Sequence, residues 1–135
     1  ILSKDPFVIF DVAHNPMKIG ALVDTLKSSL LHPRGGPGQP HPWGVPARFT
    51  TVIGIKQDKD AAAMLKSLDR ITDRYIFVAL NNVPHWSPAD LTKLTKKPSS
   101  HELDWDRTSP LLITGSFHLA VVVQSLGLMR QSIFR

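Results

Sequence analysis

The chain has 135 residues, the size of a single domain with a core of its own, and it contains no cysteine. The lack of cysteine excludes a disulfide framework, a thiolate nucleophile and cysteine-ligated zinc and favours a reducing cytoplasm, while no apolar run approaches the roughly 18 residues of a membrane helix. The formal charge of +5 is spread along the chain and clusters only at Lys93, Lys96 and Lys97, so we expect neither a membrane nor a nucleic acid as partner.

The first third of the chain predicts a strand, a helix and a long loop. Phe7–Phe10 is a short, continuous apolar run, which is typical of a strand covered on both faces. From Pro16 onward apolar residues recur at spacings of three and four, which predicts an amphipathic helix with Asn15 as its N-cap. Residues 32–48 contain five prolines and four glycines, so we expect a long surface loop inside one domain that spans residues 1–135.

Strands and helices alternate through the middle of the chain. Residues 49–55 and 74–80 are largely apolar and predict two further buried strands. A helix over residues 60–70 is expected between them, with Asp60 as its N-cap. After the third strand, a serine followed by proline predicts the start of a short helix over residues 87–96. This alternation favours an α/β layer fold with a mainly parallel sheet.

One connection near the C-terminus conflicts with a parallel sheet. Residues 102–105 predict a fourth, edge strand and Leu111–Thr114 a final buried strand, before a last helix that begins at Ser116. A parallel crossover needs about a dozen residues, and only residues 106–110 separate these two strands. The sequence leaves three alternatives open: the edge segment is not a strand, it pairs antiparallel, or a helix is missing.

Polar residues follow three of the predicted strands directly, in the loops DVAHN, KQDKD and TGS. Ligands of open α/β sheets bind at the carboxyl ends of the strands, where helix N-termini present free N–H groups. Gly115 permits close approach of a ligand, and the hydroxyl of Ser116 suits a carboxylate or phosphate. Lys59 offers a mobile cation, and Asp11 can accept hydrogen bonds from a ribose or an ammonium group.

Structural roles are the simpler explanation for several of these residues when each is taken singly. Asn15, Asp60 and Ser116 are ordinary N-caps, and a single loop histidine such as His14 is more often a surface residue than a catalytic one. The other histidines show no metal-ligand spacing, and the sequence has no GxSxG, GxGxxG or GxxxxGK[ST] motif. We therefore expect no metal site made wholly by this chain.

Taken together, the loops resemble the C-terminal domain of folylpolyglutamate synthase and dihydrofolate synthase in the Mur ligase superfamily. The blocks DVAHNP, GIKQDKDAAAML and TGSFHLAVVV stand in the family's order and match its pattern D-[GV]-A-H-N-P, G-x-x-x-D-K-D and G-S-[FL]-[HY]. The variants with Val12 and with Phe117-His118 look most like the bifunctional bacterial enzyme. The resemblance implies a Rossmann-like, three-layer α/β domain with a mainly parallel sheet, as in Mur ligase C-terminal domains.

The resemblance also implies an activity, that of an ATP-dependent acid–amino-acid ligase of folate biosynthesis. Such enzymes activate the carboxylate of dihydropteroate or of a folate as an acyl phosphate, which the amino group of L-glutamate attacks. The family's P-loop and Mg²⁺ ligands belong to a central domain that is absent here. We therefore expect an excised, monomeric, cytoplasmic domain that works with a P-loop domain in cis and holds neither ATP nor Mg²⁺ alone.

Individual roles follow from the same resemblance, which assigns no catalytic residue and no metal ligand to this domain. Asp11 and His14 would contact ATP, Asp11 at the ribose. His14, Asn15 and Ser116 would contact the glutamate. His118 is expected only to pack. Four further residues would line the pocket or order its loops: Asp58, Lys59, Asp60 and Gly115.

Three other functions stay open. A Mur-type ligase of cell-wall precursors is disfavoured because AHNP replaces the lysine-bearing loop of that branch. A stand-alone binding or regulatory module with the same fold is compatible with every residue above. Binding of nucleic acid rests on net charge only.

Overall fold

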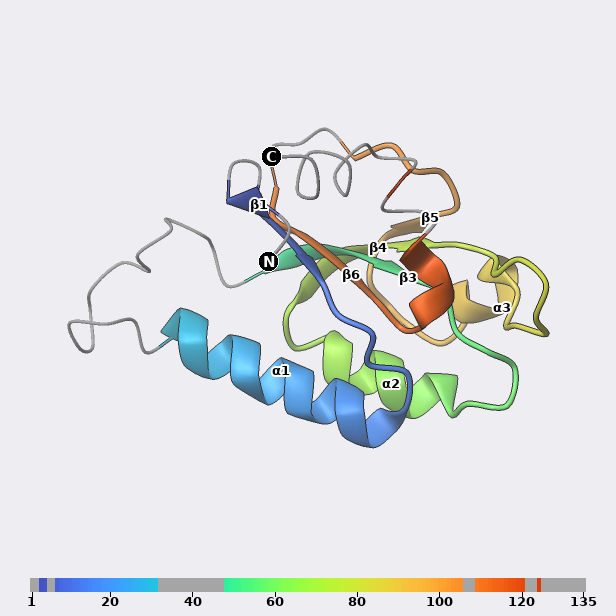
Figure 1. Ribbon diagram of the computed structural model, residues 1–135, viewed down its shortest axis with the longest axis horizontal. Coiled ribbons are helices and arrows are strands. Elements are labelled where there is room, and N and C mark those ends of the chain that lie inside the picture. The colour runs from blue at the N-terminus through green and yellow to red at the C-terminus, as the bar shows by residue number, and fades with distance from the viewer. Residues whose placement is uncertain (1–2, 5–6, 32–47, 106–108, 121–123, 125–135) are drawn as a thin grey trace.

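The described residues of the computed structural model are 3–4, 7–31, 48–105, 109–120 and 124. They form a six-stranded sheet in the order β1-β2-β6-β3-β4-β5, in which β1 pairs antiparallel with β2 and all other pairings are parallel (Figure 1). The strands are β1 (Ser3–Lys4), β2 (Phe7–Phe10), β3 (Phe49–Ile53), β4 (Thr72–Phe77), β5 (Ser99–Ser100) and β6 (Leu111–Thr114). The helical segments are α1 (Pro16–Leu31), α2 (Ala61–Leu68), α3 (Pro88–Thr92) and the 3₁₀ turn η1 (Phe117–Leu119). The predicted α/β class with a mainly parallel sheet is confirmed.

Both faces of the sheet are covered, which explains why its strands are continuously apolar. Neighbouring residues of a strand point to opposite faces, so Ile53 and Val52 of β3 belong to two different buried clusters. Helices α1 and α2 lie side by side over one face (Figure 1). Their buried side chains include Ile19, Val23, Met64, Leu65 and Leu68.

The strand order dictates which face each connection crosses. The connections from β2 to β3, β3 to β4 and β4 to β5 all move across the sheet in one direction, so right-handed crossovers place their helices on one face. Accordingly, Leu91 of α3 belongs to the same cluster as α1 and α2. The connection from β5 back to β6 moves the opposite way and must cross the other face. Trp105, only 9% exposed, lies in the cluster on that face.

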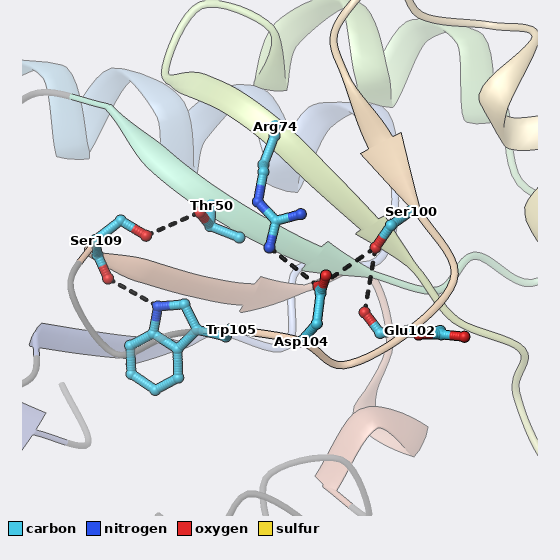
Figure 2. A network of polar contacts seen from close by, with 7 residues as sticks. All are labelled: Thr50, Arg74, Ser100, Glu102, Asp104, Trp105 and Ser109. Atoms are coloured by element: carbon cyan, nitrogen blue, oxygen red, sulfur yellow. Dashed lines mark hydrogen bonds and ion pairs between the residues drawn. The ribbon is translucent and has the colours of Figure 1, made fainter.

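The predicted edge strand over residues 102–105 is wrong, and the first of the three alternatives holds. The edge strand is β5, which pairs in parallel with β4, so the crossover to β6 extends over residues 101–110. Side-chain contacts of the described residues help to hold this segment across the sheet (Figure 2). Arg74 donates to Asp104 at 3.1 Å, and the indole of Trp105 donates to the carbonyl of Ser109 at 2.9 Å.

One further contact anchors the end of this crossover. The hydroxyls of Ser109 and Thr50 lie 3.0 Å apart, so the end of the crossover is tied to β3 next to β6 (Figure 2). The hydrogen bond from Arg74 holds the pKa of Asp104 below its ordinary value.

The structure shifts several of the predicted ends of strands and helices by a few residues. β3 ends at Ile53 rather than at residue 55, and β4 covers residues 72–77 rather than 74–80. α2 ends at Leu68 and α3 at Thr92, before the predicted ends near residues 70 and 96. α3 stops early where the chain turns toward β5, and Thr95 donates to Asp69 at 3.0 Å.

Parts of two predictions fall outside the described residues. These are the proline-rich loop, except for Arg48, and most of the last helix beyond residue 120. Within the described part of the chain, no helix combines the length and the apolar character that crossing a membrane requires.

Candidate functional site

Three loops meet at one edge of the sheet because the strands before them are parallel neighbours. β2, β6 and β3 lie side by side in that order, so the loops DVAHN, TGS and KQDKD leave the same edge. The N–H of Gly115 donates to the carbonyl of Ala13 at 3.0 Å, which joins TGS to DVAHN. Gly115 also packs against the loop after β3, since a Cβ there would lie 2.6 Å from the carbonyl oxygen of Gly54. The predicted convergence of the loops is confirmed by these contacts.

A small hollow of about 250 Å³ lies where the three loops meet. It brings together His14 and Ser116, which come from opposite ends of the sequence and were both predicted as site residues. Lys56, from the third loop, lies in the same wall. The described residues of its lining are Val12, His14, Lys56, Ser116 and His118.

The polar groups of this hollow are oriented by the backbone around them. Nδ1 of His14 lies 3.2 Å from the carbonyl oxygen of Val12. A carbonyl only accepts hydrogen bonds, so Nδ1 carries the proton and Nε2 is the acceptor of the neutral ring. Ser116 is 2% exposed, and its hydroxyl oxygen accepts from the N–H of His118 at 3.1 Å. The Ser116 hydroxyl can therefore donate its own proton.

Asn15 occupies the helix start rather than the wall of the hollow. Its side-chain oxygen accepts from the N–H of Lys18 at 2.8 Å, as an N-cap does. The predicted cap is confirmed, and it sets the direction in which α1 leaves the DVAHN loop. A direct contact of Asn15 with a ligand stays a prediction.

Asp11 faces a different hollow, of about 350 Å³, on the other side of Val12. One carboxylate oxygen of Asp11 accepts from the N–H of Ala13 at 2.8 Å, which closes the turn after β2. The remaining wall is formed by the first turns of α1, with Lys18, Ala21, Leu22 and Thr25. Asp11 and His14 are thus held in adjacent hollows that share Val12.

The three residues of the DKD motif differ in their surroundings: one is exposed at a hollow, and two stabilise the loop and the start of α2. Asp58 is exposed and lines a third hollow, of about 490 Å³, together with Lys56, Gln57 and Pro84. Lys59 accepts the indole N–H of Trp86 on its carbonyl at 3.1 Å, which braces the loop. Asp60 accepts from the N–H of Ala63 at 3.1 Å and is the predicted N-cap of α2. Lys59 and Asp60 line none of these three hollows.

Sequence reasoning missed Lys56 and gave His118 too small a role. Lys56 stands at an unspecified position of G-x-x-x-D-K-D, so the motif drew attention to Lys59 instead. The sequence did contain a signal for Lys56, because this residue directly follows the predicted buried strand over residues 49–55. His118 was expected only to pack, but it is exposed and lines the hollow with His14 and Ser116.

The two acidic residues of DKD allow a test of which one is structural. We expect Asp60→Ala to lower the free energy of unfolding by about 1 kcal/mol, because it removes the N-cap of α2. Asp58→Ala, two residues away and exposed, should change it by less than about 0.5 kcal/mol. Urea unfolding followed by circular dichroism measures both. Equal losses in the two variants would contradict the cap assignment.

The donor chemistry of the described residues does not provide a metal centre. No group of three or more His, Asp or Glu side chains among them is arranged to hold a metal ion. The described residues of the site instead offer one lysine, two imidazoles and a buried hydroxyl, and those of the adjacent hollow a carboxylate and a second lysine. This set can bind anionic and hydroxyl-bearing groups.

Two curated proteins are related to the chain in sequence, although no protein-family model matches it. Folylpolyglutamate synthase from Lacticaseibacillus casei is 28% identical over 144 residues, which cover 91% of the chain and 27% of that protein. Dihydrofolate synthase/folylpolyglutamate synthase from Escherichia coli K12 is 30% identical over 143 residues, covering 98% of the chain and 30% of that protein. The chain thus spans less than a third of the length of either relative.

Solved structures match over the same extent. Bifunctional folylpolyglutamate synthase/dihydrofolate synthase from Yersinia pestis CO92 has a TM-score of 0.71 and 25% identity, covering 95% of the chain and 30% of that protein. A structure of a bifunctional folylpolyglutamate synthase/dihydrofolate synthase with Mn, AMPPNP and L-glutamate bound has a TM-score of 0.69 and 25% identity. It covers 93% of the chain and 30% of that protein.

Proposed function

We propose that this chain, which is homologous to one domain of folylpolyglutamate synthase/dihydrofolate synthase, is the C-terminal domain of an ATP-dependent ligase that joins L-glutamate to dihydropteroate or a folate. The observation that carries the proposal is the hollow in which His14 and Ser116 meet. Because the homology covers about 30% of those proteins, the reaction needs further domains, a P-loop domain above all, and the chain alone is inactive. A monomeric state and a cytoplasmic location stay predictions.

The small hollow suits the amino-acid substrate. Its volume of about 250 Å³ lies below the range of about 300–1,000 Å³ typical of drug-sized ligands, so it favours a compact group over a pterin. The Ser116 hydroxyl is a donor inside a largely buried loop, as a carboxylate requires. The related enzyme that binds L-glutamate supports this assignment.

His14 has the properties that attack by an amino group requires. The amino nitrogen must lose a proton as it bonds to the carbonyl carbon of the acyl phosphate, while the carbon–oxygen bond to phosphate breaks. Nδ1 of His14 donates to the carbonyl of Val12, so Nε2 can accept a hydrogen of the amino group. In this role His14 orients the nucleophile and receives its proton.

The hollow beside Asp11 fits the nucleoside part of ATP. Ala21 and Leu22 give it an apolar wall, and ribose hydroxyls can donate to the carboxylate of Asp11. The related structure with AMPPNP supports this placement. ATP supplies the phosphoryl group that activates the acid. We assign no Mg²⁺ ligand to the described residues, which offer no suitable donor set, and leave the ion to the P-loop domain.

A domain graft tests the proposal. The chain replaces the homologous 30% of the Escherichia coli enzyme, and release of phosphate from ATP is measured with and without L-glutamate. We expect glutamate-dependent turnover by the graft and none by the chain alone. A folded graft that binds ATP but shows no response to glutamate would contradict the proposal and favour a non-catalytic module. A response to another amino acid would favour a Mur-type ligase.

A further inference from the structure

We propose that Lys56 binds an anionic oxygen of the ligand in the hollow and thereby sets the affinity for that ligand. The oxygen belongs either to the carboxylate of the amino acid or to a phosphate group of the nucleotide. The identity of the ligand rests on the proposed function, whereas the binding of an anion follows from the hollow itself. Neither the DxAHNP nor the DKD motif contains this lysine.

The backbone of Lys56 is held in place on both sides. Lys56 forms an antiparallel bridge with His85, and the next residue, Gln57, donates its N–H to the carbonyl of Pro84 at 3.1 Å. The carbonyl of Lys56 itself accepts from the N–H of Lys59 at 3.1 Å and closes a turn. A lysine on such a fixed backbone loses less conformational freedom on binding than one on a mobile loop.

The charge of Lys56 has no acidic partner in the part of the chain that the structure describes. Ion pairs within 4.0 Å there join Arg70 to Asp24, Arg74 to Asp104 and Lys93 to Asp90. Lys56 is nevertheless half-buried, and a partly buried ammonium group gains from a hydrogen-bonded counter-charge.

The other residues that line the hollow favour an anion as its ligand. Among the described residues of the wall, the other polar side chains are two imidazoles and one hydroxyl, and none of them is a carboxylate. Asp58, two residues further along the chain, lines the separate hollow on the other side of Lys56. The hollow therefore combines one positive charge with the hydroxyl donor of Ser116, and no described side chain of the wall opposes an anion with a negative charge.

The same position explains why Lys56 differs from Lys59. Lys59 belongs to the DKD motif, but its described contact is the hydrogen bond from Trp86 to its carbonyl, which orders the loop. Lys56 lies three residues earlier, across the turn, and lines the two hollows on either side of it. The lysine that can reach a ligand is thus the one that the motif leaves unspecified.

An NMR titration of the ¹⁵N-labelled chain tests this inference without any ligase activity. L-glutamate and inorganic phosphate are added separately at constant ionic strength, and the amide signals of His14, Lys56 and Ser116 are followed. We expect saturable shifts with at least one anion, and about tenfold weaker affinity in Lys56→Met, which keeps the apolar stem and loses the charge. Lys66→Met, at an exposed position of α2, should bind as the unmodified chain does.

Each outcome decides the question. Shifts with glutamate alone identify the carboxylate as the ligand, and shifts with phosphate alone identify the phosphate. If both bind, the KM values of the graft for L-glutamate and for ATP are compared. A rise of about tenfold for L-glutamate in Lys56→Met identifies the carboxylate, and a rise of about tenfold for ATP identifies the phosphate group. Lys56→Gln, a second neutral variant, guards against misfolding of the first. Absence of shifts, or unchanged affinity in either folded neutral variant, would overturn the inference. An inactive graft with a positive titration would reject only the proposed function.

Discussion

Replacing Gly115 with alanine will lower the free energy of unfolding by about 2–4 kcal/mol, because two separate costs add at this position. Its φ of +106° lies in a region that residues with a Cβ rarely adopt. In addition, the new Cβ would lie 2.6 Å from both the carbonyl oxygen of Gly54 and Cγ1 of Ile53. A backbone oxygen cannot move aside as a flexible side chain can, so the loops themselves must separate.

Gly20 provides a matched control for this substitution. It lies inside α1, and a Cβ there would meet no atom within 4 Å. Gly20→Ala should therefore raise the free energy of unfolding by about 0.5–1 kcal/mol through helix propensity. Urea unfolding followed by tryptophan fluorescence measures both variants. A Gly115→Ala chain as stable as the unmodified one would show that the contact between TGS and the loop after β3 is not tight.

The consequence for the site is larger than the loss of stability alone suggests. Gly115 donates to Ala13 on one side and packs on Gly54 on the other, so it sets the spacing of all three loops around the hollow. A shift of its backbone moves Ser116 relative to His14. Misplacement by about 1 Å is enough to slow a reaction that depends on orientation by about 100-fold.

The parts of the fold that were predicted correctly depend on local signals. Phe7–Phe10 and Leu111–Thr114 are short, largely apolar runs that each follow a proline, and both strands were found with the predicted bounds. The caps of α1 and α2 were predictable because Asn15 and Asp60 bond to N–H groups only three residues away. Such contacts are set by the chain itself, before any tertiary packing.

The prediction of an edge strand over residues 102–105 was wrong because tertiary contacts decide the structure of this segment. Residues 102–105 alternate polar and apolar side chains, which favours a strand, but alternation does not reveal what the side chains meet. Asp104 finds Arg74 on β4, and Trp105 is buried on the sheet face that the returning crossover must pass. The topology that requires this crossing is visible only when the order of all strands is known.

The site shows the same division between what is local and what is not. Its three loops were predictable because the carboxyl ends of parallel strands share one edge. In the loop after β3, the residue that lines the hollow was not predictable, because turns rotate successive side chains apart. The turn that Lys56 and Lys59 close separates these two lysines, and the turn at Asp11 places that carboxylate and His14 in adjacent hollows.

Removal of His14 or Ser116 will affect ligation far more than folding, and the two variants will affect different steps. In the graft, His14→Ala should lower kcat by about 100-fold, because a positioned acceptor for the amino proton is lost. Ser116→Ala should raise the KM for L-glutamate by about tenfold, because one buried donor is lost. Steady-state kinetics with varied glutamate separate these effects.

The controls for this prediction address stability and surface charge. Asp24→Ala removes a carboxylate that is 71% exposed and paired only at the surface with Arg70, so kcat and KM should not change. Urea unfolding of the chain should show losses of about 1 kcal/mol or less for His14→Ala and about 1–2 kcal/mol for Ser116→Ala, whose oxygen accepts from His118. If His14→Ala retained full kcat in a folded graft, the amino group would have to lose its proton elsewhere. Within the described part of the hollow, His118 would then be the remaining acceptor, since Ser116 and Lys56 can hold an anion but cannot accept that proton as they stand.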